Sequence, residues 1–355
     1  MKKLTVILFI LSASITCVLK GQTDTIPAEF AVADTQDVNS TLFDTDDLLE
    51  ISLKFDISYY KRKRSDIEYI DAVLQYNTSP VDSVVKNIKV KARGEMRRNY
   101  CDFPPLLLNF KMKDSVGGEF TGIDKLKLVP YCKLGNEEYV LKEYLVYKLY
   151  NVLTDLSYRV RLMRIKYINT AKDSKPLVQY GFVIEPTKLL EKRTGTKEME
   201  NIKVSQKVIK PEMMDRMAIF NYMIGNTDWS VPNMHNVVIL SQPLSERPEL
   251  AVIIPYDFDY SGFVNTDYAV PFETLPIKSV RERYFMGICR TEEVYRNALK
   301  EFSEKKDEFI KVINDFPYLS EKSKKQSIEY LMGFFNGLEK KSPVVYKFLT
   351  ECKKF

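Results

Sequence analysis

The sequence is poor in histidine, tryptophan, glycine and cysteine, and these shortages exclude several classes of protein. Among 355 residues there are 13 glycines, one tryptophan and one histidine, His235. The five cysteines include no pair with C-x-x-C spacing, so no zinc-site pattern is present. No serine lies in a G-x-S-x-G motif, which argues against a serine hydrolase of the usual kind.

Long hydrophobic runs are also missing beyond the N-terminus. Met1-Lys2-Lys3 is followed by the apolar run LTVILFILSASI, which is typical of a secretory signal and too short to span a bilayer. We expect a signal peptide over residues 1–21, export to the periplasm or the extracellular space, and no transmembrane segment. Cys17 offers a lipid anchor as the alternative, but Ser14-Ile15-Thr16 before it makes a poor lipobox.

Charge of one sign is not in large excess. The formal net charge is +5, and removal of Lys2, Lys3 and Lys20 with the signal peptide lowers it to about +2, so nucleic acid is not expected as a partner. Residues 22–47 contain acids but no lysine or arginine, which predicts an acidic linker. The remainder has the composition of a folded globular protein.

Four cysteines remain after cleavage, an even number for an oxidising compartment. Cys101 and Cys132 flank two predicted strands, LLLNF and KLKLV, and we predict a disulfide between them. Cys289 and Cys352 form a second candidate pair, for which free buried thiols are the alternative.

Periodicity divides the chain into a β-rich part and a helical part, which predicts an α+β fold. Alternating patterns predict strands over residues 48–60 and 87–93, and a helical pattern predicts an amphipathic helix over 137–153. After Glu185-Pro186, where we place the boundary, helices are predicted over 211–224 and over most of 291–348.

The most informative stretch runs from Gly225 to Gly262. Residues 237–240 and 251–254 are β-rich runs of strand length, and the spacer SQPLSERPEL between them predicts an antiparallel hairpin. The hairpin places Asp228 and Asn236 before its first strand and Asp257 and Asp259 after its second, so the two ends lie side by side. Hard divalent cations prefer such converging oxygen ligands, and phosphoryl transfer needs a cation and a carboxylate that orients the attacking hydroxyl.

These residues resemble the catalytic half of the CotH-type (spore-coat protein H-like) atypical kinases. The matching pieces are Gly225-Asn226-Thr227-Asp228, Asn236-Val237 and Pro255-Tyr256-Asp257-Phe258-Asp259. The resemblance implies a two-lobed protein-kinase-like fold, with a β-rich small lobe over 48–185 and a mainly helical large lobe over 186–355. It also implies transfer of the ATP γ-phosphoryl group, with Mg²⁺ or Mn²⁺, to a hydroxyl of an unknown acceptor such as an envelope or secreted protein.

The resemblance also implies residue roles. Asp228 is the catalytic-loop carboxylate, Asp257 and Asn236 bind the metal, and Asp259 supports them. Asn233 is the alternative to Asn236, because classical kinases place the metal-binding Asn five residues after the Asp.

Candidates for holding the phosphates are less sharply defined. Arg93-Gly94 and Lys111 match a small-lobe turn and strand of the family, so Lys111 is the first candidate for the phosphate lysine and Lys91 the second. Glu143 is the candidate for the helix glutamate that pairs with this lysine, or else faces solvent. The arginines of the turn, namely Arg93, Arg97 and Arg98, either bind phosphate oxygens or are surface residues.

Two other interpretations of the same stretch remain. Residues 257–262 fit the opening of an EF-hand loop, but position twelve is Tyr268 instead of Glu and the preceding segment is a predicted strand. A pseudokinase or envelope interaction module on a kinase-like scaffold, without phosphoryl transfer, is the alternative function.

Overall fold

The computed structural model describes residues 40–110, 118–200, 204–243, 245–247, 249–339 and 343–354, all of them within one unit that begins at Asn39. The predicted signal peptide, Cys17 and most of the predicted linker lie outside the described residues. Lys111, the first candidate for the phosphate lysine, also lies outside them.

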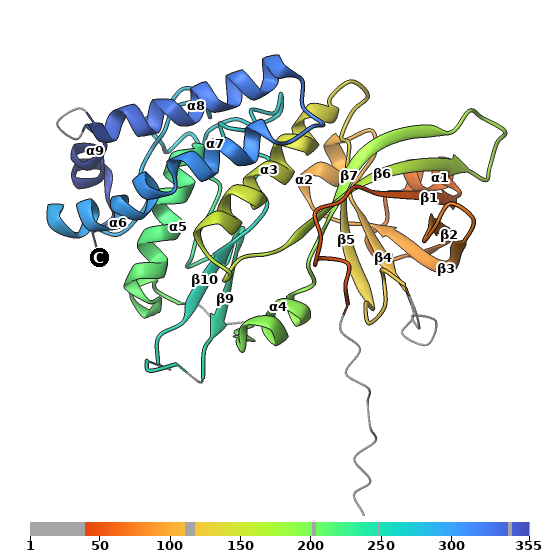
Figure 1. Ribbon diagram of the computed structural model, residues 1–355, viewed down its shortest axis with the longest axis horizontal. Helices are drawn as coiled ribbons and strands as arrows, with labels where there is room; N and C mark the ends of the chain where they lie inside the picture. Colours follow the sequence, from red (N-terminus) through yellow and green to blue (C-terminus); the bar gives the residue numbers. More distant parts are fainter. Residues whose placement is uncertain are drawn as a thin grey trace, which may run out of the picture. The chain divides into compact units, whose positions relative to one another are not determined.

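The first half of this unit is a closed barrel (Figure 1). Its strands follow the order β1-β2-β3-β4-β5-β7-β6, and β1 pairs in parallel with β6 to close the ring, whereas the other pairs are antiparallel. Apolar side chains alternate into the interior, as Ile88, Val90 and Ala92 do on β3. The strands are β1 (Leu49–Phe55), β2 (Ile70–Asn77), β3 (Ser83–Ala92), β4 (Leu106–Asn109), β5 (Lys125–Pro130), β6 (Val160–Asn169) and β7 (Leu177–Ile184).

Three helices accompany the barrel strands in the described sequence: α1 (Ile57–Lys63), α2 (Met96–Tyr100) and α3 (Glu137–Leu153). The strand predicted over 48–60 ends at Phe55 because Asp56 caps α1, with its Oδ1 accepting the Tyr59 N–H at 2.7 Å. The helix predicted over 137–153 is confirmed. Tyr144, Tyr147 and Tyr150 are buried on it, so α3 belongs to the core that its pattern predicted.

The second half is mainly helical, with a small sheet in which β10, β9 and β8 are neighbours. The predicted hairpin is confirmed, since β9 and β10 pair antiparallel with Ile239 opposite Ile253. The fold is therefore of mixed α+β type. The elements are α4 (Thr187–Thr194), β8 (Lys197–Glu198), the 3₁₀ helix η2 (Gln206–Val208), α5 (Pro211–Ile224), β9 (Val237–Ser241), β10 (Val252–Pro255), α6 (Glu292–Glu304), α7 (Lys306–Asn314), α8 (Glu321–Glu339) and α9 (Pro343–Glu351).

The folded part begins earlier than the expected boundary at residue 48. Leu42 and Phe43, which fall in the predicted acidic linker, are buried in the core. The buried guanidinium group of Arg161 donates from Nη1 to the carbonyls of Leu42 and Thr45 at 3.2 and 2.9 Å. The acidic composition of this stretch concealed a short apolar anchor.

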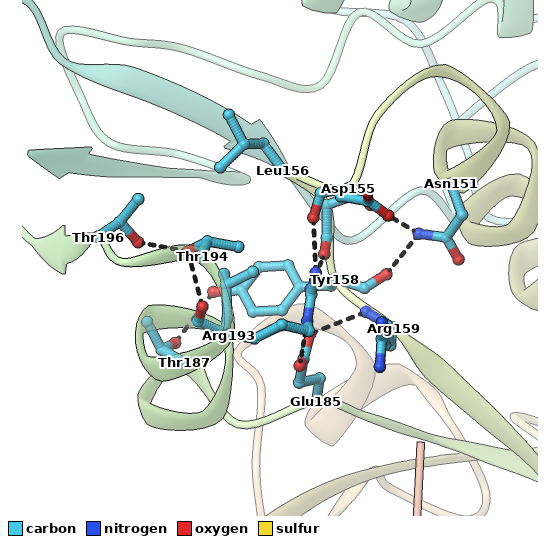
Figure 2. A network of polar contacts seen from close by, with 12 residues as sticks. Asn151, Asp155, Leu156, Tyr158, Arg159, Glu185, Thr187, Arg193, Thr194 and Thr196 are labelled. Atoms are coloured by element: carbon cyan, nitrogen blue, oxygen red, sulfur yellow. Dashed lines mark hydrogen bonds and ion pairs between the residues drawn. The ribbon is translucent and has the colours of Figure 1, made fainter. Parts of the chain in front are cut away.

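The junction at Glu185-Pro186 is braced by one arginine (Figure 2). Arg193 of α4 donates from Nε and Nη2 to the two carboxylate oxygens of Glu185, at 3.0 and 2.9 Å. The same guanidinium group donates to the carbonyls of Asp155 and Ser157, both at 2.8 Å. Because the bonds to Glu185 are charge-assisted and forked, they fix the last turn of α4 against the residue that follows β7.

The predicted disulfide is present, and so is a second one at the candidate pair for which free thiols were the alternative. Cys101 and Cys132 are joined, with their Cα atoms 4.6 Å apart, and Cys289 and Cys352 are joined at 4.8 Å. The first links the end of α2 to the turn before α3, and the second links the segment before α6 to the end of α9. Among the helices that the structure describes, we find none with the length and apolarity needed to cross a membrane.

Candidate functional site

The two ends of the β9–β10 hairpin meet at the predicted site. The Tyr256 N–H donates to the carbonyl of Asn236 at 3.0 Å, and the Gly262 N–H donates to the carbonyl of Gly225 at 3.0 Å. Gly225 ends α5 with a φ of +67°, and a Cβ there would lie 2.1 Å from the hydroxyl of Tyr330. Only glycine fits this position, where α5 turns into the Asp228 loop.

The Asp228 carboxylate is held from within its own loop. Its Oδ1 is 2.8 Å from Nε2 of His235, and its Oδ2 accepts Nδ2 of Asn236 at 3.0 Å. Asn236 also donates to the Asp228 carbonyl at 2.8 Å, while Asn226 accepts the Asp228 N–H at 3.1 Å. Asn226 is fixed in turn by Asn221 of α5, at 2.9 Å. Burial raises the pKa of Asp228, against the opposing effect of His235.

Two predicted metal ligands have a strained backbone. Asn236 has a φ of +54° and Asp257 a φ of +62°, in the left-handed region that residues other than glycine rarely adopt. Such conformations cost about 1–3 kcal/mol each and concentrate at binding sites. The strain turns these two side chains away from the regular course of the hairpin.

A cluster of three carboxylates surrounds the guanidinium group of Arg97. Glu143, Asp257 and Asp259 each offer an oxygen, and these atoms all lie within 4.8 Å of one another. Arg97 donates from Nη2 to Glu143 Oε2 at 2.6 Å and to Asp257 Oδ1 at 3.4 Å, and from Nε to Asp259 Oδ2 at 2.6 Å. Its side chain is 11% exposed. Among the described residues the partner of Glu143 is thus an arginine of α2 and not a lysine.

Aromatic residues fix the turn that carries Asp257 and Asp259. Phe258 is fully buried, with its ring 4.8 Å from that of Tyr147. The Tyr147 hydroxyl accepts the Asp257 N–H at 2.9 Å, and the Tyr268 hydroxyl donates to Asp259 Oδ2 at 2.9 Å. Asp257 remains the accessible carboxylate of the turn, because its side chain is 41% exposed and that of Asp259 is 6%.

Burial and the neighbouring charges divide the three carboxyl groups. Burial raises the pKa of Glu143, and burial followed by the charge of Asp259 raises the pKa of Asp257. Burial would also raise the pKa of Asp259, but Arg97 and the hydroxyl of Tyr268 outweigh it and lower this pKa. Asp259 therefore stays ionised, and the positive charge of Arg97 offsets its negative charge.

The structure brings some of the predicted residues to this site and leaves others elsewhere. Asn236 is buried beside Asp228, whereas Asn233 is exposed. Lys91 donates to the carbonyl of Asp66 at 2.7 Å and lies over the ring of Tyr69, and neither of these partners is among the predicted site residues. Of the two other arginines of the turn, Arg98 pairs with Asp66, which is not a predicted site residue. Arg93 interacts electrostatically with Asp257, which is.

Lys127 of β5 is a candidate that sequence reasoning missed. Its ammonium group lies 5.4 Å from the centre of the Tyr256 ring and interacts electrostatically with Asp257 and Arg93. Desolvation by the surrounding protein lowers the pKa of Lys127, and Arg93 lowers it further. The signal was the alternation KLKLV on the strand before the helix of Glu143, since kinases carry their phosphate lysine on a strand and pair it with a glutamate of the next helix.

Comparison with known proteins gives little guidance. No protein-family model and no curated protein matches the chain. Among solved structures, the chain is similar to a Helicobacter pylori proinflammatory kinase, CtkA, with 12% sequence identity and a TM-score of 0.37. The alignment covers 69% of this chain and 93% of the kinase.

Proposed function

We propose that this protein is an exported kinase-like phosphotransferase, which moves the γ-phosphoryl group of ATP to a hydroxyl group. The observation that carries the proposal is the meeting of Asp228, Asn236 and Asp257 on two adjacent turns at one end of the β9–β10 hairpin. The carboxylate of Asp228 is hydrogen-bonded to the amide of Asn236, and the partly exposed carboxylate of Asp257 lies on the neighbouring turn. This is the division of labour that phosphoryl transfer requires.

The donor set fits a hard divalent cation. Asn236 uses Nδ2 for its bonds to Asp228, which leaves Oδ1 available as an oxygen ligand. In the nearby cluster, Glu143 Oε1 is a buried oxygen without a hydrogen-bond partner in the described part of the chain. Asn236 and Asp257 would hold Mg²⁺ or Mn²⁺. When bound, such an ion offsets phosphate charge and orients the transferred group.

Asp228 is the group that accepts the proton of the acceptor hydroxyl. As the new O–P bond forms, the bond between Pγ and the bridging oxygen breaks, ADP leaves, and the hydroxyl proton passes to the Asp228 carboxylate. His235 and Asn236 hold this carboxylate in place. A pKa raised by burial makes Asp228 a better proton acceptor than an exposed aspartate.

Lys127 and Arg93 supply positive charge for the phosphate oxygens, because both interact with Asp257 across the site. Lys111 remains the candidate for the phosphate lysine that the sequence suggests. Two disulfides are consistent with an oxidising compartment, where the acceptor would be a hydroxyl-bearing envelope or secreted protein.

The first test is thermal unfolding of the full chain with and without ATP and Mn²⁺. At about a hundred times its Kd, a bound ligand adds roughly 2.7 kcal/mol of stability, so the unfolding midpoint rises by some degrees. Asp257→Ala should abolish this rise. Asp71→Ala, which removes a surface carboxylate on β2 paired with Lys89, is the matched control and should retain it. The absence of any nucleotide-dependent shift would instead favour an interaction module on this scaffold.

A further inference from the structure

Arg97 stands where a cation is expected. The oxygens of Glu143, Asp257 and Asp259 that lie within 4.8 Å of one another form an arrangement suited to a metal ion. The guanidinium group of Arg97 contacts all three residues, at 2.6, 3.4 and 2.6 Å. Arg97 comes from α2, so the positive charge at the centre of the cluster is supplied by a segment of the barrel half of the chain.

The cluster has room for more positive charge than Arg97 provides. Three carboxyl groups face one guanidinium group, and the oxygens that they offer lie within 4.8 Å of one another. The second oxygen of Glu143, Oε1, is buried and has no hydrogen-bond partner in the part of the chain that the structure describes. An unpartnered buried carboxylate oxygen is costly, and a cation would satisfy it.

Arg97 and a divalent cation on Asp257 would repel each other. Mg²⁺ binds oxygen at about 2.0–2.1 Å. An ion on Asp257 Oδ1 would therefore lie no more than about 5.5 Å from Arg97 Nη2, which is itself 3.4 Å from that oxygen. Asp257 is partly exposed, but Arg97 itself is largely buried, so like charges at this separation repel each other. Joint occupancy is therefore unfavourable.

Arg97 is carried by a short cover segment, Glu95–Cys101, which is also bonded to the barrel, because Arg64 donates to the carbonyls of Arg98 and Asn99 at 2.9 and 2.8 Å. The Cys101 N–H donates to the Arg97 carbonyl at 2.9 Å, and Cys101 is disulfide-bonded to Cys132, just before α3 and its Glu143. Tyr100 contributes a ring contact with Tyr268 at 5.0 Å. The helix α2 within this segment has no buried residue. A movement of α2 that withdraws Arg97 would therefore expose no core side chain of the helix, while the buried Cys101 stays in place.

We propose that Arg97 is an exchangeable internal cation. In the metal-free chain it closes the Glu143–Asp257–Asp259 cluster, and a divalent cation held by Asn236 and Asp257 that also takes Glu143 as a ligand displaces it and lifts the cover segment from the site. The metal that the proposed function requires is thereby coupled to movement of the cover segment. The inference rests on the proposed function for its use of a metal, but it requires neither ATP nor phosphoryl transfer.

The decisive measurement is Mn²⁺ binding to the full chain without nucleotide, by isothermal titration calorimetry. Arg97→Gln removes the competing charge and should bind Mn²⁺ about tenfold more tightly than the wild type. Arg98→Gln is the matched control, because it removes the same charge from the same helix at a residue that pairs with Asp66 instead. Its affinity should stay within about twofold of the wild type. Adding Glu143→Gln to Arg97→Gln should cancel the gain.

Equal or weaker Mn²⁺ binding by Arg97→Gln would overturn the proposal, because Arg97 would then order the ligands instead of competing with the ion. Hydrogen exchange on the wild type gives an answer even if Arg97→Gln does not fold. Displacement predicts faster amide exchange in residues 95–101 when Mn²⁺ is added, whereas slower or unchanged exchange contradicts it.

These outcomes can be told apart from failure of the proposed function. If Mn²⁺ binds in competition with Arg97 but ATP has no effect, the cation exchange is supported and the kinase function is rejected. If ATP shifts the unfolding midpoint but Arg97→Gln gains no Mn²⁺ affinity, the nucleotide site is supported and the cation exchange is rejected.

Discussion

The Asp228 loop and the Asp257 turn lie side by side, but they obtain their hydrogen bonds from different parts of the chain. The Asp228 carboxylate is bonded to His235 and Asn236, seven and eight residues further on, and the Asp228 N–H is bonded to Asn226. This loop is a local structure that follows α5 and precedes β9. Its geometry depends on few residues outside its own stretch.

The Asp257 turn, by contrast, is held by residues remote in sequence. Arg97 lies 160 residues before Asp257, and Tyr147, whose hydroxyl accepts the Asp257 N–H, lies 110 residues before it. A substitution in the Asp228 loop should therefore affect chemistry more than folding. A substitution among the partners of the Asp257 turn should affect how the barrel half and the helical half close on each other.

The largest expected effect separates the two aspartates by function. Asp228→Asn should lower ADP formation from ATP and Mn²⁺ by about 10²–10⁴-fold while retaining the ATP-dependent thermal shift, because it removes the proton acceptor alone. Asp257→Asn should remove both the ADP formation and the shift, because it removes a metal ligand. Coupled-enzyme assays and thermal unfolding measure the two properties. Loss of the shift in both variants would contradict the division of roles.

The next effect concerns stability and the buried arginine. Arg97→Ala leaves Glu143 and Asp259 as buried carboxylates without their ion-pair partner, which costs about 3–5 kcal/mol in comparable cases. Arg98→Ala breaks a more exposed pair with Asp66 and should cost about 1 kcal/mol or less. Urea denaturation in EDTA compares them. Similar losses in the two variants would show that the cluster contributes nothing special to folding.

The same contrast explains how much of the molecule the sequence alone could predict. The hairpin, α3 and α5 were predictable because each follows from a pattern within about twenty residues, and the disulfides followed from cysteine count and flanking strands. Closure of the barrel was not, because it rests on the parallel pairing of β1 with β6, about 110 residues apart. For the same reason Asp228 and Asn236 could be placed together, whereas the contact of Arg97 with Glu143 could not.

The roles of the site residues are likewise only partly predictable from local sequence patterns. The roles of Asp228, Asn236 and Asp257 stay predictions; the structure shows Asn236 bonded to Asp228 and the two turns joined by backbone hydrogen bonds. Lys127 was missed because nothing in KLKLV distinguishes a lysine that faces the site from one that faces bulk water. Only the three-dimensional neighbourhood of Tyr256 and Arg93 makes that distinction.

The two disulfides offer a way to sharpen the comparison. Replacing Cys101 and Cys132 by serine should cost roughly 3–4 kcal/mol by the chain-entropy estimate, and replacing Cys289 and Cys352 should cost about as much or slightly more. Only the first replacement should also accelerate hydrogen exchange in residues 95–101, because only Cys101 tethers the segment of Arg97. Equal acceleration in both variants would mean that the disulfide does not act on this segment.

The smallest expected effect is a difference in the direction of pH dependence, measured in EDTA. The pKa of Asp259 is lowered in the folded chain, so its ionised form stabilises the fold above the ordinary value near 3.8, and this stability is lost as the pH falls through the lowered pKa. Asp259→Asn should therefore cost about 1–3 kcal/mol at pH 7 and progressively less in acid.

The pKa of Asp228 is raised, so the folded chain binds this proton more readily than the unfolded chain, and stability falls as the pH rises from about 3.8 through the raised value. Asp228→Asn should thus leave stability at pH 7 unchanged or higher, within about 1 kcal/mol, and should lose that advantage in acid. Urea denaturation from pH 3 to pH 7 gives both profiles. Parallel profiles for the two variants would mean that the locally bonded carboxylate and the remotely paired one are stabilised in the same way.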